Sequence, residues 1–240
     1  MKAFVAQLRA EVSMTMTRGE SLLLTIGIPL GLLVFFSLVD VLPTGTKDPV
    51  TFLAPGVLAM AVLSTAFTSL AIATGFERSY LVLKRLGTTP LGRPRLIAAK
   101  IVGVLIVIAV QVAVITLAAL ALGWSPSGFS VGLAVPAVVL ATIAFASLGL
   151  LMAGTLRAEL TLALANAGFI LLMLISGMVI PVSKLPGGLR AVSRALPSEA
   201  LAHVLHAAAV GHSTGTRAWI VLAVWAVGAT VLAARYFRWE

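Results

Sequence analysis

Long uncharged runs alternate with short charged segments along this 240-residue chain. No Asp, Glu, Lys or Arg occurs in residues 21–39, 49–76, 101–156 or 160–183. A transmembrane helix needs about 20 mainly apolar residues, so the third run is long enough to cross a membrane twice. Glycine, proline and serine in the sequence GWSPSGFS at 123–130 interrupt its helical pattern and place a turn there. The pattern predicts an all-α membrane protein.

The predicted architecture is one transmembrane domain, residues 1–240, with six membrane-spanning helices. These helices are expected near residues 21–41, 51–75, 96–122, 131–154, 160–180 and 218–236. Before the first of them, the apolar residues Phe4, Leu8, Val12 and Met16 recur every four positions. This spacing predicts an amphipathic helix over residues 1–20 that lies in the membrane interface.

Residues 181–217 do not follow the pattern of a span. Pro181, Pro186 and Pro197 interrupt this segment, and its apolar stretches are too short to cross a membrane. Non-helical backbone at membrane depth must be surrounded by protein or by water. We therefore expect a re-entrant helical hairpin at the membrane surface, directly before the last span.

Residues 76–100 form the longest polar interruption between spans. Seven charged residues fall here: Glu77, Arg78, Lys84, Arg85, Arg93, Arg95 and Lys100. Each charge at the centre of a bilayer costs roughly 2.5–3.5 kcal/mol. This segment is therefore predicted to be a loop in water, and 76–95 is its candidate functional part.

Composition and charge agree with a membrane protein and give it an orientation. Hydrophobic residues make up 60% of the chain, charged residues 10%, and the mean hydropathy is +1.10. Twelve of the 17 Lys and Arg fall in the terminal segments and in the loops at 76–100 and 157–159. The positive-inside rule then predicts that both termini are cytoplasmic. Richness in Ala, Val and Arg suggests the plasma (inner) membrane of a bacterium, and the net charge of +9 is attributed to this orientation and not to nucleic acid.

Candidate chemistry is sparse. The chain has no cysteine and no G-x-x-x-x-G-K-[ST] phosphate-binding loop. His203 and His206 are three residues apart and could share a metal ion, but no third ligand is evident, so we favour surface histidines and expect no metal site. Gln111 and Asn166 are the most polar residues within the spans, and we expect them to form hydrogen bonds between helices. Any energy for transport would have to come from another polypeptide.

Two groups of short motifs resemble one known family. The first consists of Phe52-Leu53-Ala54-Pro55-Gly56, then Glu77-Arg78, then Lys84-Arg85-Leu86-Gly87-Thr88-Thr89-Pro90-Leu91-Gly92-Arg93. The second consists of Ser176-Gly177-Met178-Val179-Ile180-Pro181, Leu185-Pro186 and Leu196-Pro197. In this order they resemble the type-2 ABC transporter permeases, most closely the multidrug and daunorubicin-resistance exporter branch.

The resemblance implies a permease subunit that exports a hydrophobic or amphipathic substrate, such as a drug, an antibiotic or a lipid-like molecule. It also implies two nucleotide-binding ATPase subunits that bind ATP and Mg²⁺, a second six-span permease as homodimer or heterodimer, and membrane lipids around the complex. This chain itself would bind no cofactor and would not be an enzyme. Export of a lipid-linked glycan or polysaccharide, an ATPase-independent channel or carrier, and a membrane scaffold are the alternative functions.

The resemblance also assigns roles to particular residues. The ATPase-coupling residues are Glu77, Arg78, Leu83, Lys84, Arg85, Leu86, Thr89, Pro90 and Leu91. The outer gate hairpin contains Gly177, Pro181, Pro186 and Pro197, and the structural motif before span two contains Phe52, Pro55 and Gly56. Pro94 departs from the family pattern, because it would remove a backbone donor inside a helix that starts at Pro90.

The spacing of apolar residues in the coupling segment predicts how it would contact an ATPase. Residues 77–86 can form about two and a half helical turns that stop at Gly87. Leu83 and Leu86 would share one face and insert into a groove of the partner. The alternative is that the cations of this loop only anchor it to anionic lipid.

Overall fold

The computed structural model describes residues 2–17, 19–38, 49–88, 92–126 and 128–238, and all of its regular elements are helices. The elements are α1 (Lys2–Thr17), α2 (Gly19–Leu38), α3 (Pro49–Leu63), η1 (Ser64–Ser69), α4 (Leu70–Ser79), α5 (Val82–Gly87), α6 (Arg93–Ala121), α7 (Val131–Thr155), α8 (Ala158–Ile175), η2 (Val182–Lys184), α9 (Gly187–Ser193), α10 (Pro197–Ala209) and α11 (Thr216–Tyr236). The predicted all-α class is confirmed.

Five segments of the described residues are long and apolar enough to cross a membrane. They are Val50–Ser79, Arg93–Ala121, Val131–Thr155, Ala158–Ile175 and Thr216–Tyr236. The helix α2 is 20 residues long, but its stretch with described side chains, Thr25–Ser37, is shorter than a span. The protein is therefore a multi-span membrane protein, and the sixth span remains a prediction.

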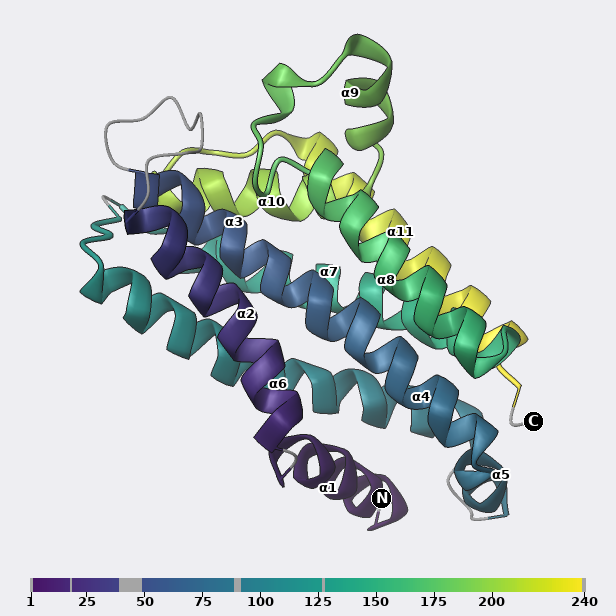
Figure 1. Cartoon of the computed structure of the whole chain (residues 1–240). Helices are drawn as coiled ribbons and strands as arrows, with labels where there is room; N and C mark the ends of the chain where they lie inside the picture. Colours follow the sequence, from purple (N-terminus) through teal and green to yellow (C-terminus); the bar gives the residue numbers. More distant parts are fainter. Residues whose placement is uncertain (1, 18, 39–48, 89–91, 127, 239–240) are drawn as a thin grey trace.

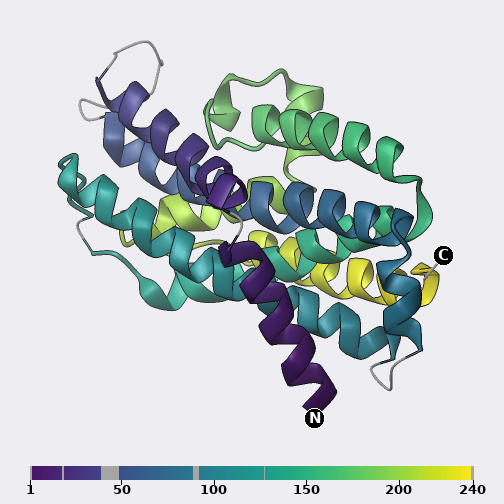
Figure 2. The same ribbon diagram turned by 60° about the horizontal axis from the view of Figure 1, so that its bottom comes forward.

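The segment Val50–Ser79 is the central helix of the bundle. In this segment 72% of the apolar stretch is buried, against 44% or less in the other four candidate spans. It runs through the middle of the molecule, blue in Figure 2, and packs against α6, α7, α8 and α10. Both ends of this segment, at α3 and at α4, therefore lie next to several other helices.

One turn of this central segment is a π-helix, η1, between α3 and α4. Close helix packing accompanies this turn, because a Cβ atom on Gly149 of α7 would lie 2.8 Å from the carbonyl oxygen of Phe67. Small residues at helix contacts allow backbones in a membrane to approach closely. The hydroxyl group of Thr65, on the same turn, donates a hydrogen bond of 2.9 Å to Oε1 of Gln111 in α6.

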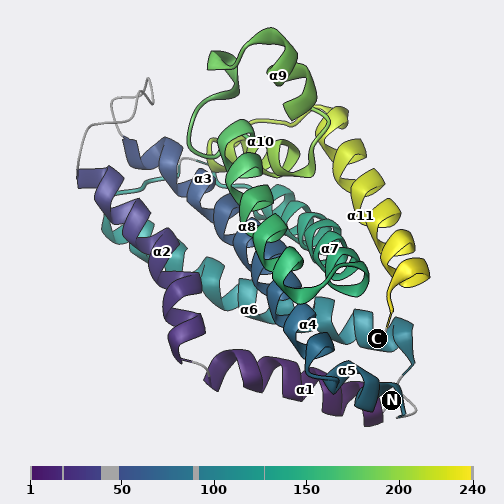
Figure 3. The same ribbon diagram turned by 45° about the vertical axis from the view of Figure 1, so that its right-hand side comes forward.

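The bundle has two distinct ends. The helices α1 and α5 and the C-terminal end of α11 lie toward one end, while α9 and α10 lie toward the other (Figures 1 and 3). We call these the α5 end and the α9 end. In Figure 3, α1 runs at a steep angle to α2 and packs against α6. Phe4, Leu8, Val12 and Met16 are all half-buried, as a single apolar stripe on α1 requires.

The predicted water-exposed loop over 76–100 is shorter in the structure. Glu77 and Arg78 lie in the last turns of α4, and Lys100 lies inside α6, which already begins at Arg93. Pro94 therefore occupies the first turn of α6, where a missing backbone donor costs little. The prediction was wrong at both ends of the segment because these charged side chains have partners within the bundle.

Candidate functional site

The α5 end contains a buried ionic cluster that joins three helices. The Nζ atom of Lys100 in α6 lies 2.8 Å from Oε1 of Glu11 in α1 and 2.8 Å from Oε2 of Glu77 in α4. The side chain of Lys100 is only 1% exposed. Gln7 donates a further hydrogen bond of 2.7 Å to Oε1 of Glu11. One lysine thus holds the amphipathic helix and the end of the central helix together.

The geometry of this cluster makes it sensitive to any change in one member. A buried ion pair that loses one partner leaves an uncompensated charge, which costs about 3–5 kcal/mol. Helix α1 also approaches α6 closely here, because a Cβ atom on Gly103 would lie 3.2 Å from Cβ of Glu11. Movement of α4 at Glu77 would therefore change the contacts of α1 and α6.

Arg78 ties the same turn of α4 to the end of a different helix, α7. Its guanidinium donates hydrogen bonds to the carbonyl oxygens of Ala153, at 3.0 Å, and Leu156, at 3.1 Å. These carbonyl groups lie at the C-terminal end of α7, where a cation also complements the helix dipole. Glu77 and Arg78 together clamp the last turns of α4 from two sides.

The helix is interrupted immediately after Glu77 and Arg78. Helix α4 ends at Ser79, and Leu81 has a φ of +60°, in the left-handed region that non-glycine residues seldom adopt. Helix α5 then runs from Val82 to Gly87. The predicted continuous helix over 77–86 is therefore wrong, although its end at Gly87 matches the structure.

The apolar face of α5 points inward. Leu83 is completely buried and Leu86 packs against the core, so these two leucines do share a face, but that face belongs to this chain. They are not available as a ridge for a partner, contrary to our expectation. The exposed apolar residues are Tyr80, Leu81 and Val82, which are 71%, 52% and 40% exposed.

The remaining predicted coupling residues divide into two groups. Lys84 and Arg85 are exposed on α5, next to the apolar residues just named. Thr89, Pro90 and Leu91 lie outside the described residues. Gly92, which follows them, has a φ of +70° and directly precedes α6. The described coupling segment is therefore a sharp turn plus one short helix.

At the α9 end, the two groups of family motifs meet. A Cβ atom on Gly56 of α3 would lie only 2.1 Å from the carbonyl oxygen of Met178, so no larger residue fits there without a shift. Pro55 lies beside it inside α3. Gly177 has a φ of +81°, and a side chain at this position would contact Val182. These glycines allow the segment after α8 to turn against α3.

The prolines of the predicted hairpin mark the starts of its helices. Pro181 precedes η2, Pro186 precedes α9, and Pro197 is in the first turn of α10. The fixed φ of proline suits these positions, because the first helical turn has unpaired backbone donors in any case. Helix α10 has 13 residues and is largely buried against α3, α7 and α11, so it packs as part of the bundle.

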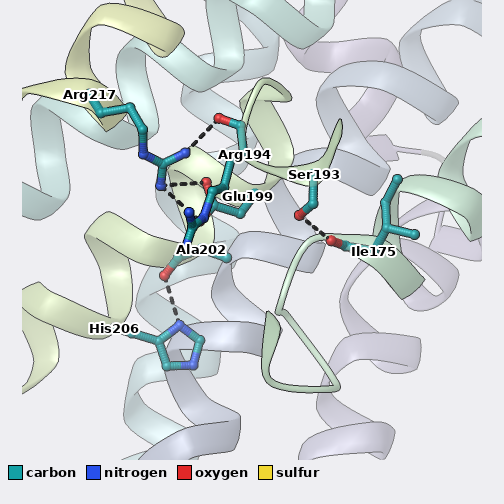
Figure 4. Close-up of polar contacts among 7 residues, drawn as sticks. All are labelled: Ile175, Ser193, Arg194, Glu199, Ala202, His206 and Arg217. Atoms are coloured by element: carbon teal, nitrogen blue, oxygen red, sulfur yellow. Dashed lines mark hydrogen bonds and ion pairs between the residues drawn. The ribbon is translucent and has the colours of Figure 1, made fainter. Parts of the chain in front are cut away.

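Polar contacts connect this hairpin to the neighbouring helices (Figure 4). Arg217 of α11 donates hydrogen bonds to both carboxylate oxygens of Glu199, each at 3.0 Å, and to the carbonyl oxygen of Arg194 at 2.6 Å. Glu199 is 6% exposed, so the ion pair is partly shielded from water. The contact fixes the start of α11 to the start of α10.

His206 of α10 lies beside a cavity of about 250 Å³. Its Nδ1 atom is 2.7 Å from the carbonyl oxygen of Ala202, and its Nε2 atom is 3.0 Å from that of Phe52. Burial lowers the pKa of His206 below its ordinary value, and the two carbonyl groups oppose this shift. The Nε2 contact joins α10 to Phe52 of the motif before span two, the Nδ1 contact stays within α10, and His203 is exposed.

The two polar residues predicted inside the spans differ in their surroundings. Gln111 is buried, accepts the hydrogen bond from Thr65, and donates one to the carbonyl oxygen of Thr25 at 2.6 Å, as expected for contacts between helices. Asn166 of α8 is exposed and donates to the carbonyl oxygen of Leu162 in its own helix. The expectation was therefore correct for Gln111 and wrong within this chain for Asn166.

Several of these contacts had no clear signal in the sequence. The residues Glu11, Tyr80, Glu199 and Arg217 were not singled out, because isolated charges and aromatic residues near span ends are common in membrane proteins. Only Lys100 had a signal in the sequence. It lies seven residues after Arg93, so in a helix that starts at Arg93 it would lie roughly 10 Å inside that helix, where a buried partner could be expected.

Apolar helices of membrane-spanning length, joined by buried polar contacts at both ends, define an integral membrane protein with a helical bundle. Comparison with protein families makes the class specific: the ABC-2 type transporter family matches residues 3–209. The chain therefore belongs to this family, as its motifs indicated. Its permeases are membrane transport subunits that generally work with separate ATPase subunits. No match is found among curated proteins.

Proposed function

We propose that the chain is the transmembrane permease subunit of an ATP-driven ABC exporter of the multidrug type. Two partner ATPase subunits bind ATP and Mg²⁺ and supply the energy. The complex lies in a bacterial plasma membrane with the α5 end, and hence both termini, on the cytoplasmic side. The observation that supports this proposal best is the exposed apolar turn at Tyr80–Val82, held on a clamped helix end.

The apolar turn has the features of a docking surface. Tyr80, Leu81 and Val82 are exposed at the end of the bundle that carries most of the cations, which the positive-inside rule assigns to the cytoplasmic side. The cations Lys84 and Arg85 lie directly beside them. A central apolar contact with charged residues at its rim is the usual anatomy of a protein interface.

The clamp on α4 provides a route for force from this surface into the bundle. A push on the Tyr80–Val82 turn acts on the last turns of α4 at Glu77 and Arg78. Glu77 transmits the displacement to α1 and α6 through Lys100, while Arg78 transmits it to the junction of α7 and α8. In this mechanism the two residues position helices and take no part in ATP hydrolysis.

A hydrophobic or amphipathic substrate, whether drug, antibiotic or lipid-like, fits the exposed helix faces. The exposed residues of α6 between Ile106 and Leu120 are uncharged, and those of α11 between Ile220 and Leu232 are uncharged as well. A pathway lined by such faces would strip water from a charged or heavily hydroxylated cargo without replacing its hydrogen bonds. Apolar cargo crosses such a pathway at lower cost than a glycan does.

Asn166 supports a second six-span permease in the complex. This residue lies near the middle of α8, and its amide is exposed on a helix of membrane-spanning length. An amide in contact with lipid is unfavourable, whereas one that reaches a neighbouring helix can form hydrogen bonds. A homodimer or heterodimer across α8 would give the side chain such a neighbour.

The hairpin over 181–217 acts as the outer gate in this proposal. The close approach of Gly56 to Met178 connects the hairpin to the central helix, so a displacement of that helix also reaches the α9 end. A single cysteine at Val182 of this cysteine-free chain tests the gate. Its rate of thiol labelling should change when the ATPase traps nucleotide, and identical rates would contradict gating.

Docking is tested by co-purification of the chain with its ATPase subunit, followed by transport and ATP hydrolysis in proteoliposomes. Leu81→Asp should weaken the complex by about 30-fold, because losing a central apolar contact costs ~2 kcal/mol or more. Ser79→Asp is the matched control, since it adds the same charge at an exposed neighbouring position. Leu83→Asp should instead prevent folding, because Leu83 is buried.

The possible outcomes separate the alternatives. Transport without any co-purifying ATPase would indicate a channel or carrier and refute the proposal. If the Leu81→Asp and Ser79→Asp variants bind the ATPase equally well, the Tyr80–Val82 turn is not the docking surface.

A further inference from the structure

Gln111 joins two other helices, each at a point where that helix departs from regular α-helical geometry. Its side chain lies in α6 and is completely buried. The amide nitrogen donates a hydrogen bond of 2.6 Å to the carbonyl oxygen of Thr25 in α2, and the amide oxygen accepts one of 2.9 Å from the hydroxyl group of Thr65 in η1. A carbonyl oxygen can only accept, so the contact with Thr25 fixes the orientation of the amide.

The contact with α2 is made at a proline. Pro29 lies inside α2 and has no N–H group, so it cannot donate to the carbonyl oxygen of Thr25, as a residue at that position of a regular helix does. Gln111 donates to this oxygen instead. Neighbouring helices supply such donors to membrane helices that contain proline. The amide of Gln111 therefore acts on the carbonyl group at which α2 can bend.

The sequence around Pro29 favours bending of α2. Gly27 and Gly31 lie two residues before and two residues after this proline. Glycine lowers the stability of a helix, and sharp bends occur at proline, at glycine and at π turns. Close packing does not require Gly31, because a Cβ atom there would meet nothing within 4 Å. The part of α2 after Pro29 can therefore change direction relative to the part before it.

The contact with the central helix is made at its π turn. The N–H group of Leu70 donates to the carbonyl oxygen of Thr65, five residues earlier, which is the hydrogen-bond spacing of a π-helix. A threonine hydroxyl in a helix can bond to its own backbone, but that of Thr65 donates to Gln111 of another helix. Turns of this kind are frequent at functional sites. A change in the π turn would move the hydroxyl group that holds the amide of Gln111.

We propose that Gln111 couples the bend of α2 at Pro29 to the π turn of the central helix. When the turn changes, Thr65 moves, the amide of Gln111 shifts with it, and the hydrogen bond to Thr25 is weakened, so α2 bends differently. Helix α6 has no proline after its first turn and supports Gln111 between the two bending points. Gln111 is thus a positioning residue. Its use in export rests on the proposed function, whereas the link itself is a property of the isolated chain.

The test measures the bend in nanodiscs without any ATPase. The absence of native cysteine allows spin labels at Phe35→Cys, 54% exposed on α2, and at Val224→Cys, 64% exposed on α11. These helices lie on opposite sides of the bundle (Figures 1 and 3). Phe35 lies about 9 Å along α2 from Pro29, so a change of about 20° in the bend moves this label by about 3 Å. Labels at Ile28→Cys and Val224→Cys form the control pair, because Ile28 precedes Pro29.

The substitution Thr65→Val removes the hydroxyl group and keeps the shape of the side chain. We expect it to shift the distance between the labels at 35 and 224 by about 3 Å and to leave the control pair unchanged. Thr68→Val is the matched control, because the hydroxyl group of Thr68 is buried in the same π turn and has no hydrogen-bond partner among the described residues. In Gln111→Leu protein, Thr65→Val should cause no further shift.

Pro29→Ala gives an independent check, because alanine supplies an N–H group for the carbonyl oxygen of Thr25. In this background neither Thr65→Val nor Gln111→Leu should move the label at 35. Equal distances in the parent chain and in Thr65→Val would overturn the proposal, and so would equal shifts with Thr65→Val and Thr68→Val. A shift with Thr65→Val that persists in Gln111→Leu protein would overturn it as well.

Transport in proteoliposomes separates this inference from the proposed function. Gln111→Leu should lower the ratio of substrate transported to ATP hydrolysed severalfold and leave ATPase binding unchanged, because Gln111 is not part of the Tyr80–Val82 turn. An unchanged ratio would overturn the role of Gln111 in export. Failure of the parent chain to bind an ATPase would count against the proposed function, and the spin-label distances would still decide whether the link exists.

Discussion

Replacing Lys100 by methionine tests the buried cluster at the α5 end most directly. Methionine has a similar length and fills the site with an apolar chain, so the substitution removes the charge with little change in volume. Glu11 and Glu77, which are 13% and 21% exposed, then face each other without the cation that joins them. Both repulsion and lost hydrogen bonds separate α1 from α4.

The expected cost follows from the burial of the three groups. Removing one partner of a buried ion pair destabilises proteins by about 3–5 kcal/mol, and here two carboxylates lose the same partner. Partial exposure of both glutamates places the expected loss near the lower end, about 3 kcal/mol. Glu11→Gln alone should cost less, because Lys100 keeps its contact with Glu77.

Thermal unfolding in nanodiscs, followed by the fluorescence of the four tryptophans, measures this loss. The control is the triple variant with Glu11→Gln, Glu77→Gln and Lys100→Met, which has no unpaired charge and should regain most of the lost stability. The ratio of substrate transported to ATP hydrolysed gives a second readout, since a broken clamp should lower this ratio even in protein that is folded.

Two results would refute this reasoning. If Lys100→Met unfolds at the same temperature as the parent chain, the cluster does not hold α1 and α4 together. If the triple variant is as unstable as the single variant, the lysine contributes through packing and not through charge.

Three further predictions concern other parts of the bundle. Gly56→Ala should abolish the folded protein, because the added Cβ would lie 2.1 Å from the carbonyl oxygen of Met178. Gly188→Ala is the control and should be tolerated, because its Cβ would meet nothing within 4 Å. The yield of folded protein in size-exclusion chromatography measures both effects, and equal yields would contradict the prediction. Leu81→Gly should not lower the Tm, because it relieves a positive φ that costs about 1–2 kcal/mol, and a lower Tm would contradict the left-handed turn. Burial lowers the pKa of His206, so below a pH of about 6.5 the unfolded chain gains a proton that the folded chain resists, and stability falls. His206→Gln should reduce this dependence of Tm on pH, and an unchanged profile would contradict it.

The helices were predictable because charge and hydrophobicity carry most of the information about spans. The uncharged run over 101–156 contains most of α6, all of α7 and the turn between them, as its length required. The prolines at 181, 186 and 197 indicated an interrupted segment before the last span, and the structure places each of them at the start of a helix. These features are local or depend on the membrane thickness, so they can be read without knowing which helices touch.

Features that depend on contacts between distant residues were not predictable. Lys100 looked like a residue of a wet loop because its partners, Glu11 and Glu77, lie 89 and 23 positions away. The inward direction of Leu83 depends on the interruption between α4 and α5 at Leu81, and no glycine or proline lies there to predict it. Spacing alone showed that two leucines share a face, but it could not show what covers the face.

The π-helical turn of η1 also controls the rotational setting of the central helix. A π turn accommodates one residue more than an α turn, and each residue of an α-helix turns the chain by about 100°. Deleting one residue from Ser64–Ser69 would therefore restore a regular α-helix but rotate everything after it. Glu77 would point away from Lys100, and Arg78 would point away from the end of α7. The rotational setting of the half of this segment that leads to the α5 end is thus encoded by a single additional residue near the middle of Val50–Ser79.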